Sequence, residues 1–462
     1  MAAAFAAPAL GELRSALGPG GLVVPGDASY PTVRLPWNRR YDPVRPLAIA
    51  LPRSAKDVQT CVRWAVKRGI RIAVRSGGHS TAGQSSTTGL LVDLQRLAGV
   101  RAGGDRARVG PGARLASVYA ALWSANGRTI PAGTAPTVGV SGLTLGGGHG
   151  FLSRSLGLAC DSLVGAEIVT ADGRIRRCSP SKEPDLYWAL RGGGQGSFGV
   201  VTALEFETHR VDQVATCAME WPWAEAAQLV AAWTSFVAGA PDELSCVLAL
   251  RVPATPGGMP TIALNGLVVG TKGDAEAILE PLVVATGPTR VRTVQRDYDV
   301  AVRYFEGDQA DIRRGIGVAS GYARKPLSPA GREALVAAVE ARHADPSLRR
   351  GGAVLFALGG AVNRVGPGGT AFVHRRALFS VELLALWDGK PGQARNLDWL
   401  AQARTAMRPH LSGEAAQNYA DPALENARRA YYGANLPRLV ALKRRVDPSN
   451  VFRHGQSIPT HL

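Results

Sequence analysis

The spacing of apolar residues predicts alternating helices and strands in the first part of the chain. A helix that starts after a Ser54 cap and stops at Gly69 would have one apolar face, made of Val58, Cys61, Val62, Ala65 and Val66. The pattern also predicts strands over 70–74, 90–94 and 164–170, and helices over 115–126 and 184–190. This alternation is typical of α/β organisation.

Beyond about residue 211 the pattern changes to short segments of alternating apolar and polar residues. Three of them, 246–252, 261–269 and 379–386, predict an antiparallel sheet. A last helix is expected after an Asn435 cap, with Pro437 in its first turn and Asp447 at its end. We therefore expect three parts, over residues 1–211, 212–411 and 412–462.

Glycine gives the clearest sign of a ligand site. The chain has 55 glycines, and they concentrate in three loops between Ser76 and Gly199. One loop contains the run Gly146-Gly147-Gly148, which contributes no side chain to a core. Such a run suits a place where main chain meets a ligand closely or adopts a positive φ.

Composition excludes several classes of function. The 53 Lys and Arg against 36 Asp and Glu give a net charge of +17, but the basic residues are dispersed and no nucleic-acid-binding motif accompanies them. The five cysteines are widely spaced, which indicates neither a disulfide framework nor a metal site. No apolar run reaches the roughly 18 residues of a membrane span. Residues 1–10 are Ala-rich without a basic start, so the compartment stays open.

Three glycines have the spacing of a dinucleotide-binding fingerprint, but the segments around them do not fit that motif. Gly194, Gly196 and Gly199 have the spacing of the motif. The motif requires a strand before it and a helix after it. Here a predicted helix precedes the glycines and the β-branched residues 200–202 follow them, so the pattern does not favour a nicotinamide-dependent dehydrogenase.

Five segments carry a resemblance to a known family. They span 46–65, 75–83, 146–161, 188–202 and 431–459, and include Arg75-Ser76-Gly77-Gly78-His79-Ser80 and Tyr431-Tyr432-Gly433-Ala434-Asn435. In this order they resemble the berberine-bridge-enzyme-like family of FAD-linked oxidases, in the vanillyl-alcohol oxidase superfamily. The resemblance covers almost the whole chain. It implies an α+β fold, with an α/β-type FAD-binding domain of the PCMH type and a substrate domain whose antiparallel sheet is covered by helices.

The resemblance also implies where FAD would bind. The family's FAD-linking histidine falls on His79, and many members have a second link to a cysteine where this chain has Ala135, so we expect a single histidyl bond. Gln195 and Ser197 depart from the family pattern, which we expect to alter loop hydrogen bonds only. The cofactor-binding residues that the resemblance implies are Arg75, Ser76, Gly77, Gly78, His79, Ser80, Gly83, Gly133, Thr134, Val138, Gly139, Gly142, Gly146, Gly147, His149, Gly150, Leu152, Leu158, Asp161, Gly199, Val201 and Asn435.

Candidates for catalysis come from the same comparison and from strand periodicity. Tyr431 corresponds to the family's catalytic tyrosine, and from the sequence alone Tyr432 is an equal alternative. Glu382 shares a strand face with Ser380 and Leu384, so it is a base candidate if that face meets the flavin and an exposed surface residue if it does not. His149 and His374 are weaker candidates.

The expected reaction is hydride removal from a small oxygenated or amine-bearing molecule, such as a sugar, an alkaloid or another secondary metabolite. Family members with a small valine at the position of Val138 tend to use dioxygen, which would be reduced to hydrogen peroxide. The alternatives are a dehydrogenase with another electron acceptor, an oxygenase that works through a flavin–oxygen adduct, and a flavin-binding protein without turnover. We expect a small-molecule substrate and dioxygen as partners, with no nucleic acid and no membrane.

Overall fold

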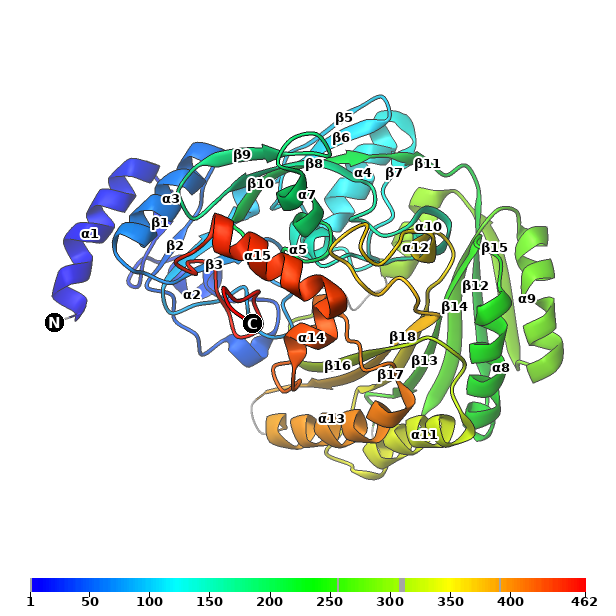
Figure 1. The fold of residues 1–462 in the computed structure, drawn as a ribbon. Coiled ribbons are helices and arrows are strands. Elements are labelled where there is room, and N and C mark those ends of the chain that lie inside the picture. The colour runs from blue at the N-terminus through cyan, green and yellow to red at the C-terminus, as the bar shows by residue number, and fades with distance from the viewer. Residues whose placement is uncertain (1, 256, 307–311, 390–391) are drawn as a thin grey trace.

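The computed structural model describes residues 2–255, 257–306, 312–389 and 392–462. Two sheets build the first part of the chain (Figure 1). The smaller sheet has the strand order β1, β2, β4, β3, with bounds Leu22–Val23, Ala48–Ala50, Leu90–Asp93 and Ile72–Arg75. Strands β2, β4 and β3 are parallel, and β1 is antiparallel to β2. Helices α1, α2 and α3 accompany this sheet, over Ala2–Leu17, Tyr30–Val33 and Ala55–Lys67.

The second sheet is antiparallel and has the order β5, β6, β10, β8, β9. Its strands are Val100–Gly103, Arg106–Val109, Val200–Glu207, Leu163–Val169 and Ile175–Cys178. The helices of this part are α4, α5, α6 and α7, over Leu115–Asn126, Val140–Leu145, Ser153–Leu156 and Pro184–Leu190. Of these, α6 contacts α12 (Ala361–Arg364) and β13 (Leu244–Val252) of the next part. A two-stranded ladder joins β7 and β11, Arg128–Thr129 and His209–Arg210.

A seven-stranded antiparallel sheet forms the second part, in the order β15, β12, β14, β13, β17, β18, β16. These strands are Arg290–Arg296, Val214–Trp221, Thr261–Val269, Leu244–Val252, Gly351–Ala357, Phe379–Trp387 and Gly315–Ala323. Four helices cover its outer face: α8, α9, α11 and α13, over Ala226–Gly239, Lys272–Thr286, Pro329–Ala344 and Gln393–Met407 (Figure 1). The short helices α10 and α12, Tyr298–Glu306 and Ala361–Arg364, lie toward the first part.

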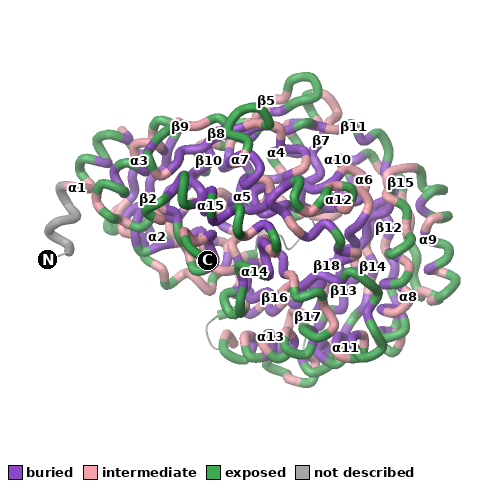
Figure 2. The backbone as a smooth tube through the Cα atoms, in the orientation of Figure 1, coloured by how far each residue is buried: buried purple, intermediate pink, exposed green. Residues whose placement is uncertain are grey.

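Along β18, alternate side chains point to opposite faces of the sheet, one toward the outer helices and one toward the first part of the chain. Val381, Leu383 and Ala385 pack with the outer helices in the largest hydrophobic core. Ser380, Glu382 and Leu384 therefore point toward the first part of the chain. Many buried positions follow the strands, and the outer helices carry exposed positions as well (Figure 2).

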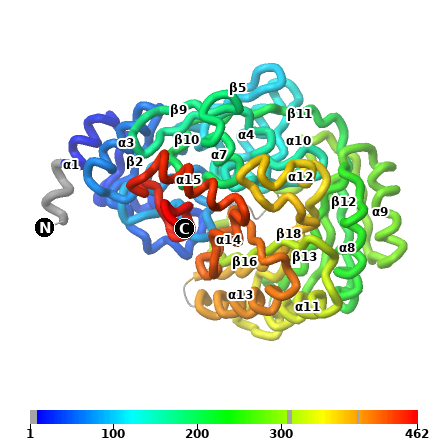
Figure 3. Tube along the Cα trace, in the orientation of Figure 1, coloured from blue at the N-terminus to red at the C-terminus, as the bar shows by residue number. Residues whose placement is uncertain are grey.

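The end of the chain returns to the first part. Helices α14 and α15, Ala427–Tyr432 and Leu436–Val446, lie beside the early segments of the chain (Figure 3). Leu439, Val440 and Leu442 share a core with residues of α4, β8 and α7. The buried Lys443 ammonium donates to the carbonyl of Ser197 at 2.6 Å. This arrangement supports the division at 211/212 and 411/412, which we retain as a proposal.

Most predicted elements are confirmed, with two local corrections. The capping box of Ser54 and Asp57 is present at α3, but Val66 is 40% exposed and Trp64 takes a buried place on that helix. Asn435 precedes α15 without capping it through its side chain. Its amide instead donates to the carbonyls of Pro367 and Thr370, at 2.8 and 3.1 Å.

Candidate active site

A cavity of about 350 Å³ lies between the first part of the chain and the inner face of the seven-stranded sheet. Its walls come from the loop after β3, the α5 region, residues of β10, β16 and β18, and the segments 417–420 and 452–454. Its volume is within the range of roughly 300–1,000 Å³ that is usual for small-molecule sites. The position between two structural layers makes this cavity the candidate active site.

The structure brings part of the predicted set to this cavity. The predicted residues that line it are Ser76, Gly77, Gly78, His79, Ser80, Val138, Gly139, Gly142, Gly199 and Val201, together with Ala135. The others lie outside the lining: Arg75, Gly83, Gly133, Thr134, Gly146, Gly147, His149, Gly150, Leu152, Leu158, Asp161 and Asn435. Neither Glu382 nor Tyr431 is in the lining, although Leu384, on the same strand face as Glu382, is.

Two glycine loops cross beside the cavity at the closest distance that main chain allows. A Cβ atom on Gly77 would lie 2.2 Å from the nitrogen of Gly139, and one on Gly139 would lie 2.0 Å from the Ser76 hydroxyl oxygen. Any side chain at either position would force the loops apart. The crossing fixes the His79 loop against the segment that carries Thr137 and Val138.

His79 is held from two sides at the cavity wall. Its ring stacks on Trp37, with centroids 4.5 Å apart and an angle of 18° between the planes. On the other side, its Nε2 atom lies 2.9 Å from the Thr137 hydroxyl oxygen. Burial, with a smaller contribution from the positive charge of Arg114, lowers the pKa of His79 to about 4. The imidazole is therefore neutral near pH 7.

Three predicted cofactor ligands have other partners. Arg75 is buried and donates to the carbonyls of Val33 and Arg34, at 2.7 and 2.8 Å, so it anchors the loop after β3. The carboxylate of Asp161 is paired with both terminal nitrogens of Arg375, at 2.7 and 2.8 Å. Asn435 holds main chain, as described above. In the structure these three side chains hold protein segments, and their contact with the cofactor stays a prediction.

The triple-glycine run is explained by protein contacts. Gly147 and Gly148 have φ values of +113° and +76°. A Cβ on Gly147 would come within 2.6 Å of Phe372, and one on Gly150 within 1.8 Å of the Ala132 carbonyl oxygen. The positive φ values agree with the expectation for this run, and the crowding around Gly147 comes from a neighbouring protein segment.

Glu382 is buried beside the cavity, with 5% of its surface exposed, so the alternative of an exposed strand residue is wrong. Burial raises the pKa of its carboxyl to about 8, although hydrogen bonds with Ser380 and Tyr419 oppose the shift. His149 lies above it, with Nε2 at 3.6 Å from a carboxyl oxygen, and burial lowers the pKa of this imidazole to about 4. At neutral pH both groups are mostly uncharged.

Tyr419 connects this pair to the cavity. It lines the cavity, hydrogen-bonds Glu382, and has its ring centroid 5.8 Å from that of His149. Phe356 closes the other side of His149, with a centroid distance of 4.6 Å. A titratable carboxyl with a raised pKa, set beside a cavity, has the properties of a general base.

Tyr431 is packed in a core and is not part of the cavity lining. It is 1% exposed in a hydrophobic core, and its hydroxyl accepts a hydrogen bond from the Asp421 N–H at 3.0 Å. Burial raises the pKa of this phenol to about 12. Tyr432 is buried in the same core. Tyr431 therefore lies outside the cavity lining, whereas Tyr419 lines the cavity and Glu382 is buried beside it.

His374 lies outside the cavity lining and is buried. Its ring stacks on Tyr322, with centroids 4.4 Å apart, and its Nδ1 atom lies 3.3 Å from the carboxylate of Glu414. Sequence reasoning missed Trp37 and Tyr419. Neither lies in a glycine-rich loop or in a periodic apolar segment, and only the fold brings them to the cavity.

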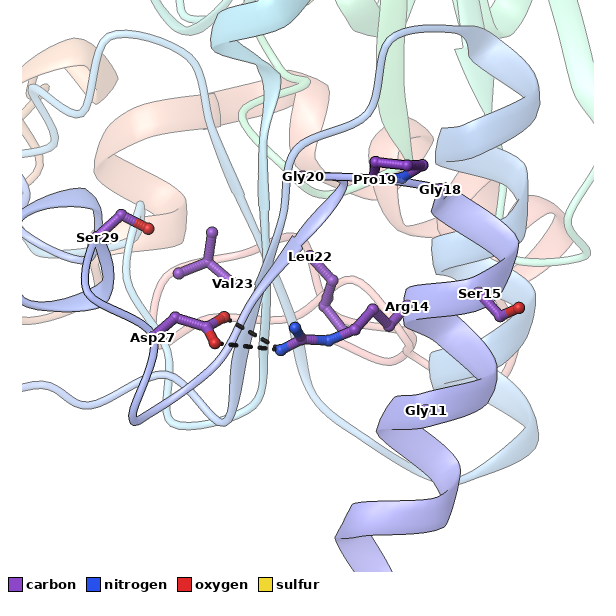
Figure 4. A pocket seen from close by; sticks show the side chains of 10 residues that line it. All are labelled: Gly11, Arg14, Ser15, Gly18, Pro19, Gly20, Leu22, Val23, Asp27 and Ser29. Atoms are coloured by element: carbon purple, nitrogen blue, oxygen red, sulfur yellow. Dashed lines mark hydrogen bonds and ion pairs between the residues drawn. The ribbon is translucent and has the colours of Figure 1, made fainter.

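A second hollow lies at the surface beside α1 (Figure 4). The Arg14–Asp27 ion pair crosses it at 3.1 Å, and most of its lining residues are exposed. It contains none of the predicted site residues.

Over the described ranges, no group of His, Cys, Asp and Glu side chains is arranged to hold a metal ion. Among the described helices, none has the length and apolar character needed to span a membrane.

The cavity fits a flavin dinucleotide where glycine main chain borders open space. A Cβ added to Gly142 or Gly196, both in the lining, would meet no protein atom within 4 Å. The indole nitrogen of Trp37, also in the lining, is buried without a hydrogen-bond partner. Bare main chain and an unpaired donor are features that an elongated polar cofactor can use.

Comparison with known proteins places this site in a family. Residues 46–179 match the FAD binding domain family, and residues 417–459 match the berberine and berberine-like family. An uncharacterized FAD-linked oxidoreductase of Bacillus subtilis, YgaK, is 32% identical over 95% of this chain and 97% of its own length. A chitooligosaccharide oxidase of Gibberella zeae is 30% identical, covering 90% of this chain and 88% of its own length.

A solved structure agrees with these relatives. Physcomitrella patens BBE-like 1 superposes with a TM-score of 0.90 at 30% identity, covering 98% of this chain and 99% of its own. The two family matches fall on the parts that supply the His79 loop and Tyr419. The chain therefore belongs to the berberine-bridge-enzyme-like family of FAD-linked oxidoreductases.

Proposed function

We propose that this FAD-linked oxidoreductase is an oxidase that removes a hydride from a hydroxyl-bearing carbon of a small carbohydrate-like molecule and reduces dioxygen to hydrogen peroxide. The observation that carries the proposal is Glu382, a buried carboxyl with a raised pKa that Tyr419 connects to the cavity. Alcohol oxidation requires a base for the hydroxyl proton as the C–H bond breaks. An amine-bearing substrate remains a second candidate, because a base would serve it in the same way.

The cofactor would be attached through His79 alone. His79 lies in the cavity wall with a neutral imidazole, and Ala135, also in the wall, has no thiol for a second bond. The bound flavin supplies the site that accepts the hydride. Gly77, Gly78 and Gly139 would place main-chain N–H groups near its phosphates, and Gly142 and Gly196 leave room for it.

The protein's own groups would handle the proton. Glu382 in its ionised form accepts the substrate hydroxyl proton, and Tyr419 orients the carboxyl through their hydrogen bond. His149 and Phe356 enclose the pair and limit the access of water. Because burial raises the pKa of Glu382 to about 8, the ionised fraction increases with pH up to that value.

The substrate class rests on the relatives' names and on the pocket. The Gibberella zeae relative is named for the oxidation of chitooligosaccharides. A sugar with a free reducing end presents an anomeric hydroxyl whose oxidation matches a single base beside the flavin. Dioxygen as the acceptor is supported by Val138, a small residue in the cavity wall.

Turnover with a panel of reducing mono- and oligosaccharides tests the proposal. Oxygen uptake and peroxide release in equal amounts, with a marked loss in Glu382→Gln, are expected. Turnover only with a quinone or dye would favour a dehydrogenase, and oxygen incorporation into the product would favour an oxygenase. A protein that binds FAD and turns over none of the sugars or amines would be a flavin-binding protein, contrary to the proposal.

A further inference from the structure

Trp37 and His79 form a stacked pair at the cavity wall. Trp37 lies before the first parallel strand, and its ring covers one face of the His79 imidazole at 4.5 Å. The main-chain N–H of Trp37 also donates to the carbonyl of Gly78 at 3.1 Å. Trp37 therefore contacts the His79 loop through both its side chain and its main chain.

Thr137 fixes the imidazole in a second direction. The Thr137 hydroxyl oxygen lies 2.9 Å from the Nε2 atom of His79. The main chain of Thr137 is also close to the His79 loop, because a Cβ on Gly77 would come within 2.7 Å of the Thr137 carbonyl oxygen. Within the described ranges, the hydrogen bonds of the His79 side chain involve Nε2 only. Stacking defines the ring plane, and the hydrogen bond defines the rotation within that plane.

This restraint leaves one ring nitrogen for chemistry. A neutral imidazole has one N–H and one nitrogen lone pair, and only the lone pair can form a new bond. If Nε2 donates its proton to Thr137, the lone pair belongs to Nδ1. Burial, followed by the charge of Arg114, lowers the pKa of His79 to about 4, which keeps the ring neutral.

We propose that Trp37 and Thr137 are positioning residues for the covalent attachment of FAD to His79. The inference rests on the proposed histidyl linkage. In that step one methyl C–H bond of the flavin and one imidazole N–H bond are lost, and one C–N bond forms. The two electrons pass to the flavin and then, with two protons, to dioxygen, which gives hydrogen peroxide. Holding the ring in one orientation accelerates such a step by reducing its entropic cost.

The test measures attachment separately from binding. Apoprotein is mixed with FAD in air, and at intervals the flavin that precipitates with the acid-denatured protein is compared with the total bound before denaturation. The variants are Trp37→Leu, Trp37→Phe, Thr137→Val and Thr137→Ser. Trp223→Leu and Thr234→Val, in the outer helical layer, control for loss of a tryptophan or of a threonine hydroxyl.

We expect Trp37→Leu and Thr137→Val to bind FAD and to attach it at least tenfold more slowly than the wild type. Trp37→Phe and Thr137→Ser, which keep an aromatic face and a hydroxyl, should recover most of the rate. Attachment at the wild-type rate in both Leu and Val variants overturns the inference. If these two do not fold, attachment at least tenfold slower in both Trp37→Phe and Thr137→Ser, with wild-type rates in the controls, also contradicts it, because both variants keep the feature that is proposed to position the ring. Wild-type protein whose flavin stays entirely in the supernatant would instead overturn the His79 linkage itself.

Discussion

At the scale of single residues, Glu382 is a buried carboxyl whose raised pKa links stability to pH. Its carboxyl is buried beside His149 and Tyr419, and burial raises its pKa to about 8. Between the ordinary pKa of a glutamate and pH 8, the folded protein keeps a proton that the unfolded chain has lost. The free energy of unfolding therefore decreases as pH rises through this window, by up to about 1.4 kcal/mol per unit of pKa shift.

Glu382→Gln should remove this dependence. Relative to the variant, wild-type protein is expected to lose stability as pH rises from about 5 to about 8, and urea unfolding at several pH values measures the difference. Glu220→Gln, at an exposed strand position, is the matched control and should leave the dependence unchanged. Parallel curves for wild type and Glu382→Gln would show that the carboxyl is ionised in the folded protein at neutral pH.

Substitutions of Tyr431 and Tyr419 test which of these tyrosines acts in catalysis and which only stabilises the fold. The Tyr431 hydroxyl accepts one hydrogen bond in a core, so Tyr431→Phe should cost about 1 kcal/mol of stability and leave turnover near the wild-type rate. Tyr419→Phe removes a hydrogen bond to the proposed base. A loss of about 10- to 100-fold in kcat is expected, given about 1.5–3 kcal/mol for a hydrogen bond to a charged group. Steady-state kinetics of both variants decide the question, and the reverse order of effects would restore Tyr431 as the base.

At the scale of elements, periodicity and capping were sufficient for much of the fold. The helix at 184–190 and the strand at 261–269 have the predicted bounds, because Pro184 opens the helix and alternation marks the strand. The cavity is different, since it depends on contacts between distant segments. Arg75 has the sequence position of a cofactor ligand, yet its guanidinium is used to hold the main chain of residues 33 and 34.

The glycine crossing provides an element-scale prediction. Gly139→Ala places a Cβ 2.0 Å from the Ser76 hydroxyl oxygen, so the two loops must separate. We expect a loss of about 1–3 kcal/mol in stability and a marked decrease in bound FAD. Gly142→Ala is the control for the fold, because its Cβ meets no protein atom, and it should keep the stability of the wild type. Thermal unfolding and flavin content measure both, and a stable Gly139→Ala with full FAD would contradict the tight crossing.

At the scale of the whole molecule, the last segment joins the parts that form the cavity. Lys443 and Asp447 are fully buried, 2.6 Å apart, and the ammonium also donates to the carbonyls of Ser197 and Phe452. The sequence showed a lysine four residues before an aspartate at a helix end, which is a common surface arrangement. Only the return of α15 to the first part of the chain buries this pair.

Lys443→Met should therefore lower the free energy of unfolding by about 3–5 kcal/mol, because it leaves a buried carboxylate unpaired. Arg445→Ala, which breaks an exposed ion pair of the same helix with Asp185, should cost at most about 1 kcal/mol. Denaturant unfolding of both variants compares the two. Equal small effects would mean that the C-terminal segment contributes little to the stability of the assembled molecule.

The most direct test of the central claim is the rate of flavin reduction by an oxidisable sugar, measured by rapid mixing without oxygen in wild type and Glu382→Gln. We predict that the variant retains its FAD and is reduced about 10²–10⁴ times more slowly, the usual range for loss of a general base. The wild-type rate should also increase with pH up to about 8, following ionisation of Glu382. Equal reduction rates in the two proteins, with flavin bound in both, would contradict the assignment of this cavity's base and the oxidase mechanism built on it.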